Sequence, residues 1–527
     1  MRDFELPGRS VACGENGMAA TSHPLATLTA LDVLRAGGNA VDAAVAAVAV
    51  QCVVEPAMTG IGGDCFVLLA PAAGGVVALN GSGRAPAAAT AAHLRELGVG
   101  EIAGTVHAVT VPGAIDAWGR LLERHGTRDL AELLQPAIRC ADDGFVVTPR
   151  VAWDWGREGE RLLRSSGGRV IYLPDDRAPV AGQKMRCPAL ANTLRRIAER
   201  GPDAFYRSEL AERMVAYLRS EGGLHTLDDF AAAAGEFVDP IKTTYRGLEV
   251  FECPPNGQGV IALLMLNILE GFDLGSLDPN GAERLHLEAE ATRLAFRDRN
   301  ACLADPAAVD VPLGRLLDKD YAARLRRLID RERALEVMPP PLLAEHADTV
   351  YLTVVDRDRN LVSFINSVFD SFGSGLVCPE TGVLFHDRGK SFVLDPTHPN
   401  VIAPNKRPMH TIIPALAFEG GRPTIGFGVM GGHYQPVGHA HVLANLVDFG
   451  LDPQAAIDAP RAFAQDGELR LEAGVSEATA GALAGLGHHV ARSGRPLGGG
   501  QMIMIDHARG VLIGGSDPRK DGLALGY

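Results

Sequence analysis

The stretch Asp348-Thr-Val-Tyr-Leu-Thr-Val-Val-Asp356 decides how this chain folds and which chemistry it can carry. Its β-branched and aromatic residues predict a strand, and a polar turn, 357–360, separates it from a second predicted strand, Leu361-Val-Ser-Phe-Ile-Asn-Ser367. If the peptide bond before Thr349 is cut, this residue carries both a hydroxyl nucleophile and an α-amine. The amine, with a pKa of roughly 7.7–8.0, can take the hydroxyl proton near neutral pH. An ordinary strand threonine is the alternative interpretation.

A glycine-rich stretch, Gly426-Phe-Gly-Val-Met-Gly-Gly432, lies downstream of the hairpin. It follows a predicted strand, 411–418, and precedes a predicted helix, 437–447. Backbone N–H groups at such a junction are free donors, and glycine lets a reacting carbonyl approach closely. Gly431 and Gly432 are therefore candidates for an oxyanion hole, with a tight turn that has no chemical role as the alternative.

Size and charge narrow the class of protein. The 527 residues show no obvious linker, which favours one large unit, and 46% hydrophobic with only 6% aromatic residues suggests helices packed closely on sheets. The net charge of −14 argues against nucleic acid or an anionic membrane as a partner. The start of the chain, 1–7, lacks the apolar core of a signal peptide, and there is no run of 18 apolar residues, so we expect a cytoplasmic protein.

The remaining patterns predict alternating helices and strands. The eight cysteines show no metal-like spacing and are expected to be small buried hydrophobes, with neither a metal nor a cofactor. Gly60-Ile-Gly-Gly63 lacks the Lys-Ser/Thr ending of a phosphate loop. A proline cluster, 339–341, predicts an accessible segment before the cut. We expect helices at 27–35, 41–50, 260–270, 282–296 and 477–485, a mainly helical region at 113–218, and strands at 66–70, 77–80 and 245–252.

Ordered motifs along almost the whole chain resemble the γ-glutamyltranspeptidase family of self-cleaving N-terminal-nucleophile hydrolases. The matching stretches are 19–26, Gly37-Gly-Asn-Ala-Val-Asp-Ala-Ala44, 60–63, 111–113, Asn405-Lys-Arg-Pro408, 431–432 and 516–519. The resemblance implies an α+β fold, the four-layer αββα sandwich. It also implies a precursor cut between Asp348 and Thr349 into a large chain, 1–348, and a small chain, 349–527, which stay intertwined as a heterodimer, with higher oligomers left open.

By the same resemblance Thr349 is the nucleophile of both maturation and turnover. In maturation its hydroxyl attacks the carbonyl of Asp348, and water hydrolyses the resulting ester. In turnover it attacks a small-molecule amide and forms an acyl-enzyme, which water or an amine releases. Ser367 stands where the family usually has a threonine bonded to the nucleophile, and Gly431 and Gly432 match the oxyanion pair.

The predicted acyl pocket departs from the family pattern. Ser391 stands at the usual aspartate, Arg388 at the usual glutamine and Phe369 at the usual asparagine. The two serines that usually hold the α-carboxylate of the substrate correspond to His410-Thr411. A substrate amine has therefore lost its carboxylate partner and meets a like charge.

Further departures concern the large chain and the pocket entrance. The family's carboxylate-binding arginine matches Ser82, and Arg84, two positions on, is a candidate to replace it. The segment 393–403 is short where typical members carry a lid, which predicts a more open site. An acyl group with a terminal anion and no amine suits Arg388 and His410, because a guanidinium pairs with carboxylate in a fork.

These residues lead to an expected amidohydrolase that prefers dicarboxylate-like monoamides, such as glutaryl or oxamate types, as in relatives similar to cephalosporin acylases and oxamate amidohydrolase. One alternative is a glutathione hydrolase or γ-glutamyltransferase. Another is a catalytically silent homologue, against which the retained Thr349 and Ser367 argue.

Structural roles remain open for some of the same residues. Arg388 can form a surface ion pair with Asp387 or Asp395, and His410 can be a satisfied interior histidine. His439 and His441 are not expected to bind metal, because alternate positions on a helix point apart.

Overall fold

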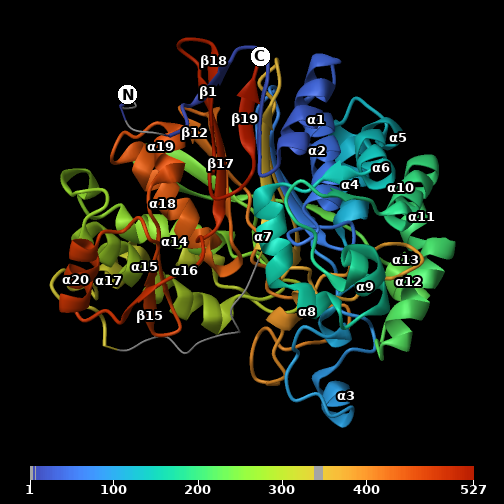
Figure 1. Cartoon of the computed structure of the whole chain (residues 1–527). Coiled ribbons are helices and arrows are strands. Elements are labelled where there is room, and N and C mark those ends of the chain that lie inside the picture. Colours follow the sequence, from blue (N-terminus) through green and yellow to red (C-terminus); the bar gives the residue numbers. More distant parts are fainter. Residues whose placement is uncertain (1–3, 6–7, 337–347) are drawn as a thin grey trace.

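Two seven-stranded sheets lie face to face, with helices over both outer faces (Figure 1). The structure, a computed structural model, describes residues 4–5, 8–336 and 348–527. All strand pairs within these two sheets are antiparallel. The first sheet has the order β1 (Ala12–Gly14), β18 (Val511–Ser516), β17 (Gly499–Asp506), β13 (Arg422–Met430), β12 (Ala415–Glu419), β9 (Leu248–Glu252), β8 (Ile241–Tyr245). The second has the order β19 (Leu523–Gly526), β2 (Met18–Thr21), β10 (Asp348–Val355), β11 (Leu361–Phe369), β3 (Asp64–Ala70), β4 (Val77–Gly81), β7 (Glu236–Val238).

Three apolar layers separate the four structural layers. Between the sheets lies a cluster that includes Phe66, Tyr351, Ile365 and Leu416. A larger cluster joins the second sheet to α1 (Pro24–Arg35), α2 (Ala40–Val54) and α4 (Ala114–His125). A third joins the first sheet to α14 (Gly259–Leu269), α15 (Ala282–Cys302) and α18 (Gln435–Val447). The predicted helix–sheet–sheet–helix architecture is confirmed.

Strand alternation fixes where the candidate nucleophile lies. Along β10, Val350 and Leu352 pack toward the helices, whereas Tyr351 and Val355 pack between the sheets, as expected when successive side chains point to opposite faces. The pairing with β11 is irregular at its start, where Asp348 pairs with Phe369 and Val350 with Asn366. Such a bulge changes the direction of nearby side chains, and here it falls on the predicted cleavage site.

Both sheets are built from both predicted chains. Strand β10 pairs with β2 of the large chain and with β11 of the small chain, and β11 pairs in turn with β3. Neither 1–348 nor 349–527 therefore contains a complete sheet. A cut before Thr349 leaves the two pieces joined by strand hydrogen bonds and by a common core.

Two predicted strands need correction. The segment 245–252 is a hairpin of β8 and β9, because Arg246 (φ 49°) and Gly247 (φ 89°) form the left-handed turn that tight hairpins require. The strand predicted at 411–418 begins only at Ala415. Before Ala415 the backbone hydrogen-bonds to side chains instead of to a neighbouring strand. The Gln258 side chain donates to the carbonyl of Thr411, and Ile413 N–H donates to the Gln435 side chain.

Most other elements agree with the predictions, with longer ends. The helix predicted at 41–50 is α2, and the helix at 477–485 is α20 (Glu477–Gly485). Strand β2 and helix α19 (Pro453–Asp458) escaped prediction because both are short. The region 113–218 is helical as expected, with α4, α6 (Gln135–Asp142), α7 (Pro149–Arg157), α8 (Gly159–Leu162), α9 (Ser166–Tyr172), α10 (Pro188–Arg200) and α12 (Glu209–Ser220). The proline cluster at 339–341 lies outside the described residues.

Two further observations concern cysteines and membranes. The eight cysteines are all free thiols; five are buried, and Cys13 is exposed. In the described ranges, no helix combines the length and the apolar character that crossing a bilayer requires.

Candidate active site

Thr349 and Ser367 meet at the paired ends of β10 and β11. Both side chains are completely buried, and their hydroxyl oxygens lie 3.1 Å apart. Ser367 Oγ also accepts hydrogen bonds from Phe369 N–H, at 2.8 Å, and from Arg388 Nη2, at 3.2 Å. Either hydroxyl can donate in the contact between Ser367 Oγ and Thr349 Oγ1. The structure thus brings together the two hydroxyls that the sequence paired.

Arg388 is an interior residue of this group. It is fully buried in the short 3-10 turn Arg388–Ser391, and its Nη1 donates to Thr411 Oγ1 at 2.7 Å. Its guanidinium lies over the ring of Phe369, 4.1 Å from the centroid, a favourable cation–π arrangement. Burial lowers its pKa to about 10, so it stays charged at neutral pH. The surface ion pair left open by the sequence is therefore not what forms.

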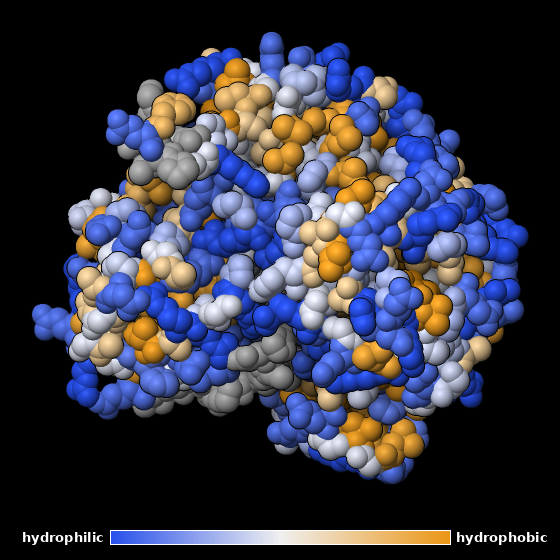
Figure 2. All heavy atoms as spheres, in the orientation of Figure 1, coloured by the Kyte–Doolittle hydropathy of each residue, from blue (hydrophilic) through white to orange (hydrophobic). Residues whose placement is uncertain are grey.

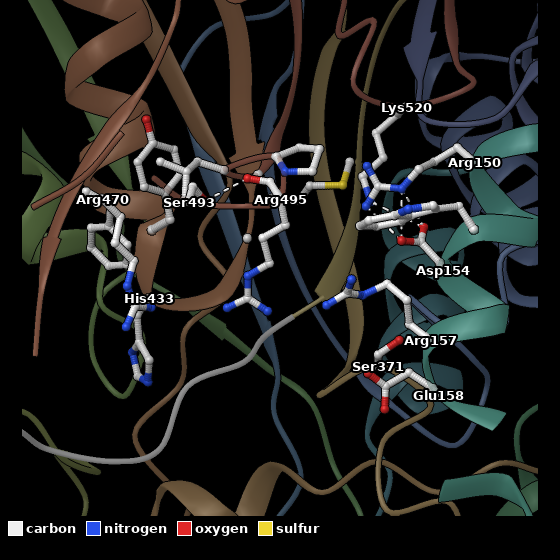
Figure 3. Close-up of a pocket in the computed structure, with 18 of the residues that line it drawn as sticks. Arg150, Asp154, Arg157, Glu158, Ser371, His433, Arg470, Ser493, Arg495 and Lys520 are labelled. Atoms are coloured by element: carbon white, nitrogen blue, oxygen red, sulfur yellow. Dashed lines mark hydrogen bonds and ion pairs between the residues drawn. The ribbon is translucent and has the colours of Figure 1, made fainter. Parts of the chain in front are cut away.

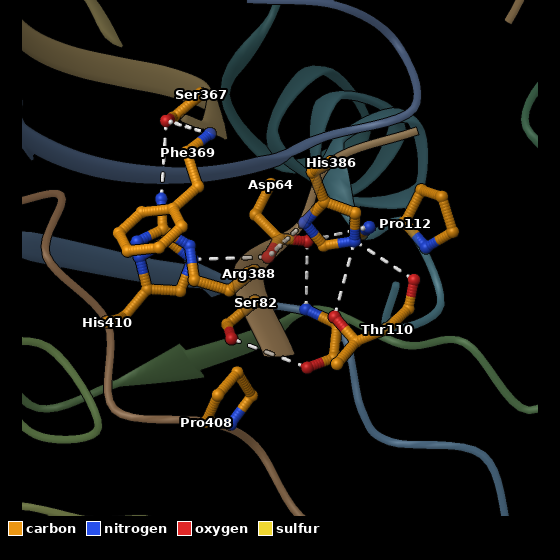
Figure 4. Close-up of polar contacts among 12 residues, drawn as sticks. Asp64, Ser82, Thr110, Pro112, Ser367, Phe369, His386, Arg388, Pro408 and His410 are labelled. Carbon is orange, nitrogen blue, oxygen red and sulfur yellow. Dashed lines mark hydrogen bonds and ion pairs between the residues drawn. The ribbon is translucent and has the colours of Figure 1, made fainter. Parts of the chain in front are cut away.

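Asp64 supplies the counter-charge, which the sequence did not reveal. This buried carboxylate begins β3, and its Oδ1 accepts from the N–H groups of Gly83 and Gly113, at 3.0 and 3.1 Å (Figure 4). Although burial by itself raises its pKa, His386, His410 and Arg388 together bring that pKa down to about 2. The only signal in the sequence was an acidic residue directly after Gly60-Ile-Gly-Gly63.

His410 is a satisfied interior histidine, as one of the two interpretations had it. Its Nε2 lies 3.1 Å from Asp64 Oδ2 (Figure 4). Its ring also meets the ring of Phe66 edge-on. Burial and the neighbouring Arg388 lower its pKa to about 3, so it is neutral at neutral pH. Its chain position is fixed by Asn256, whose carbonyl accepts from His410 N–H at 2.8 Å.

The glycine pair lies between a strand and a helix, but the strand is β13, which the sequence did not predict, rather than the segment 411–418. Gly431 has φ 127° and Gly432 φ 54°, and a Cβ on Gly431 would lie 2.8 Å from the Cα of Gly498, so only glycine fits there. Gln258 ties this turn to the acyl-pocket residues, because its Nε2 donates to the carbonyls of both Gly432 and Thr411. Gly432 starts a short 3-10 turn ahead of α18, where backbone donors are available.

Of the remaining predicted substrate-binding residues, Ser391 lies beside the site and Arg84 does not. Ser391 is buried beside Arg388, and its Oγ has no partner among the described residues. Arg84 instead lies at the surface, where it pairs with Glu236 at 2.8 Å and donates to the carbonyl of Asn405. No described contact joins it to the other site residues. Its proposed role stays a prediction without support from geometry.

A pair of buried carboxylates, Asp370 and Asp387, lies next to the acyl-pocket residues in the chain. Asp370 N–H donates to Asp387 at 3.0 Å, and Lys390 pairs with Asp370 at 2.8 Å. Burial and the nearby Asp370 hold the pKa of Asp387 well above its ordinary value. Arg161 of the large chain reaches both carboxylates at 3.6 Å. These residues follow Phe369 and precede Arg388, so they anchor both sides of the acyl pocket.

The two histidines that the sequence rejected as metal ligands have carboxylate partners. His439 Nδ1 lies 2.7 Å from Glu252, and His441 Nδ1 lies 3.1 Å from Glu288. Within the described residues, one group has ligand atoms close enough for a metal: His286, Glu290 and His488, within 4.8 Å of one another. Its atoms already bond one another or the chain, as in the 2.7 Å contact between His286 and His488.

Comparison with known proteins identifies the family. The sequence pattern of the family described as "Gamma-glutamyltranspeptidase" matches residues 26–527. The chain belongs to the γ-glutamyltranspeptidase family. It is 38% identical to the "Glutathione hydrolase-like YwrD proenzyme" of Bacillus subtilis, over 97% of this chain and 99% of that one. It is 37% identical to the "Acylase ACY 1 proenzyme" of a Pseudomonas strain, over 97% and 93%.

A solved structure extends the similarity to the fold. The crystal structure of cephalosporin acylase from Bacillus halodurans superposes with a TM-score of 0.93 at 40% identity, covering 100% of this chain and 99% of that one. The protein is thus a γ-glutamyltranspeptidase-family N-terminal-nucleophile amidohydrolase, a hydrolase of C–N bonds made as a proenzyme. The expected family, fold and enzyme class are confirmed.

Proposed function

We propose that the chain cuts itself between Asp348 and Thr349 and then hydrolyses monoamides whose acyl group ends in an anion and has no α-amine. The observation that carries this proposal is Arg388, a buried cation in contact with both Ser367 and Thr411. Ser367 in turn contacts Thr349 Oγ1, so a charged group lies two contacts from the nucleophile. A carboxylate at the far end of a short acyl chain would find its partner there.

The first step is maturation. Thr349 Oγ1 attacks the carbonyl carbon of Asp348, the C–N bond breaks, and the α-amine of Thr349 is released as an ester forms. Water then hydrolyses the ester, which frees the Asp348 carboxylate and regenerates the hydroxyl. Ser367 can donate a hydrogen bond to the attacking oxygen throughout. The irregular strand pairing between Asp348 and Val350 supports this step, because a bulge turns the backbone out of the regular ladder near the Thr349 hydroxyl.

In turnover the new α-amine accepts the proton of the Thr349 hydroxyl as it attacks the substrate amide. The proton then goes to the leaving amine, and water hydrolyses the acyl-enzyme. Backbone N–H groups of Gly431 and Gly432 are the proposed donors to the oxyanion. Arg388 binds the terminal anion, whereas His410 helps indirectly, because its N–H already faces Asp64.

The environment of Arg388 supports an anion over an amine. Ser391 offers a neutral hydroxyl where a carboxylate would hold an amine. Asp64 already accepts hydrogen bonds from two backbone N–H groups and from His410. An ammonium group placed here would meet the Arg388 charge without a carboxylate of its own.

Two matched chromogenic substrates test the proposal. Glutaryl-p-nitroanilide and γ-glutamyl-p-nitroanilide differ only in the α-amine, and we expect kcat/KM to be higher for the glutaryl compound. A preference for the γ-glutamyl compound would reinstate glutathione hydrolase. The mass spectrum of the purified protein should show chains of 1–348 and 349–527. One uncut chain, unchanged by Thr349→Ala, would indicate a silent homologue.

A further inference from the structure

A cleft opens beside the glycine pair, between the large and small chains. One wall is α7 with the turn that follows it, and the other is the small-chain segment 493–498 (Figure 3). The described residues that line the cleft include Gly431, but not Arg388 or Thr411. Figure 2 shows hydrophilic residues along the hollow in the middle of this face. The cleft therefore borders the proposed oxyanion glycine and is distinct from the residues of the acyl pocket.

The walls of this cleft carry mostly positive charge. Among the described lining residues two are acidic, Asp154 and Glu158, and both belong to the α7 wall. Six described lining residues are basic: Arg150, Arg157, Arg161, Arg470, Arg495 and Lys520. The chain as a whole has a net charge of −14, so the positive charge of this cleft is opposite in sign to that of the molecule. Low-dielectric walls with charge of one sign concentrate ligands of the opposite sign.

Arg157 is the cation best placed to bind a ligand anion. Arg150 is neutralised by Asp154, at 2.9 Å, and Arg161 by Glu158, at 3.3 Å. By contrast, the described contact of the Arg157 guanidinium is the ring of Trp153, 4.8 Å from the centroid. In the part of the chain that the structure describes, no carboxylate forms an ion pair with Arg157. Stacking on an indole orients a guanidinium and leaves its N–H donors for a ligand.

His433 provides a neutral donor on the side of the cleft opposite α7. It directly follows Gly432, is 4% exposed and lines the cleft (Figure 3). Arg299 Nη1 donates to His433 Nδ1 at 3.2 Å, so the neutral imidazole must carry its hydrogen on Nε2. Burial and the Arg299 charge hold its pKa well below the ordinary value. Nε2 has no partner among the described residues.

We propose that this cleft is a subsite for the amine half of the substrate and that it selects amines carrying an anionic group such as a carboxylate. Arg157 pairs with the anion, and His433 Nε2–H donates to an oxygen of the same amine. The inference rests on the proposed function, because the amine half is what departs when Thr349 is acylated. It assigns a second charge preference, independent of the one at Arg388.

Two isosteric substrates separate this preference from the acyl preference. Glutaryl-4-aminobenzoate and glutaryl-4-aminobenzamide share the acyl group, and only the first has an anionic leaving amine. We expect the parent enzyme to favour the aminobenzoate compound in kcat/KM, and to lose that preference as NaCl rises, because salt screens exposed charges. Equal rates for the two compounds at low salt would overturn the proposal.

Variants assign the preference to residues. Arg157→Gln should lower kcat/KM for the aminobenzoate compound about two- to fivefold, the range for an exposed ion pair, and leave the aminobenzamide compound unchanged. Arg164→Gln is the matched control, because Arg164 is an exposed arginine that does not line the cleft. If Arg157→Gln lowers both rates equally, or the control behaves like it, the charge assignment is wrong.

Two variants with amide side chains, His433→Asn and His433→Gln, test the role of His433. In His433→Asn the side-chain oxygen can still accept from Arg299, but the donor at the Nε2 position is lost. His433→Gln places an amide N–H near that position. We expect KM for the aminobenzoate compound to rise in the Asn variant and to recover in part in the Gln variant. Nitrogen-15 NMR of the parent should show neutral His433 with its hydrogen on Nε2, and the opposite tautomer would refute this role.

Direct binding distinguishes failure of the subsite from failure of the proposed function. If the parent hydrolyses neither glutaryl compound, the function is wrong, but the cleft can still be titrated with free 4-aminobenzoate and 4-aminobenzamide by ligand-observed NMR. Tighter binding of the aminobenzoate, weakened in Arg157→Gln, supports the subsite on its own. Equal binding of both amines overturns it.

Discussion

Replacing Arg388 by methionine should separate the stability of this protein from its activity. At neutral pH the guanidinium is charged in both the folded and unfolded states, and burial lowers its folded pKa from its ordinary value to about 10. Because one pKa unit corresponds to about 1.4 kcal/mol, keeping this charge inside costs about 3 kcal/mol. Its hydrogen bonds to Thr411 and Ser367 return roughly 1.5–3 kcal/mol each. The hydrogen bonds offset most or all of the cost, so Arg388→Met should change the free energy of unfolding by only about 0–3 kcal/mol.

Activity should respond far more strongly. Removing one partner of a desolvated charge pair costs about 2–5 kcal/mol. We therefore expect kcat/KM for glutaryl-p-nitroanilide to fall roughly 30- to 5,000-fold, since about 1.4 kcal/mol is a factor of ten. Valeryl-p-nitroanilide has the same chain length without the carboxylate, and its hydrolysis should be preserved. The assays are denaturant unfolding and initial rates on the two anilides, after the two-chain form has been verified by mass spectrometry.

The control for Arg388→Met is Lys390→Gln. Lys390 is another cation of the same turn, but it pairs with Asp370 rather than with the nucleophile's hydroxyl partner. It should leave the ratio of glutaryl to valeryl rates near that of the parent. If Arg388→Met keeps the parent ratio, the reasoning about the acyl pocket is refuted, whatever the effect on stability.

Three further outcomes follow from the same contacts. Ser367→Ala removes the 3.1 Å hydroxyl contact to Thr349 and should slow both self-cleavage and turnover about tenfold or more, measured by gel densitometry and initial rates; unchanged rates contradict the contact's role. Gly431→Ala, at φ 127° and against Gly498, should destabilise the fold by about 1–3 kcal/mol, seen as a lower Tm. Burial lowers the pKa of His225 to about 4, so between about pH 7.5 and 5.5 this histidine takes up a proton in the unfolded state only. The free energy of unfolding of the unmodified protein should therefore fall by about 1 kcal/mol over this range because of His225. His225→Gln should lose less stability over the same range, and equal losses in the two proteins contradict this.

The sequence predicted the fold where local pattern and tertiary environment agree. The hairpin of β10 and β11 is β-branched, ends in a polar turn and is buried on both faces, so every local preference favours strands. Prediction failed at Tyr245–Glu252, where the alternation continues through Arg246-Gly247 and only the positive φ angles reveal the turn. It failed again at 411–414, because the side chains that capture those backbone groups come from distant segments.

The sequence pointed to the candidate reacting residues and revealed much less of the charges around them. Thr349, Ser367 and the glycine pair are specified by motifs, whereas Asp64 acquires its importance only when β3 meets the loops at Gly83 and Gly113. The sequence gave no indication of Arg157 and His433, because the cleft they line is formed by segments that lie far apart in the chain. Charge arrangements of this kind depend on long-range packing that periodicity does not encode.

The location of Asp64 explains how the acyl pocket can hold a buried cation and still accept an anion. A carboxylate that faced the substrate would pair with Arg388 and repel a substrate anion. Asp64 is instead fixed by two backbone N–H groups and by the neutral His410, which stands between it and the guanidinium in Figure 4. The negative charge of Asp64 favours the charged form of Arg388 and raises its pKa. It does so without accepting a hydrogen bond from the guanidinium N–H groups that a ligand needs. Asp64→Asn should therefore lower the pKa of Arg388 further and destabilise the fold, yet preserve the order of the glutaryl and γ-glutamyl rates; a reversal of that order would mean that Asp64, and not the loss of an acid at Ser391, sets the preference.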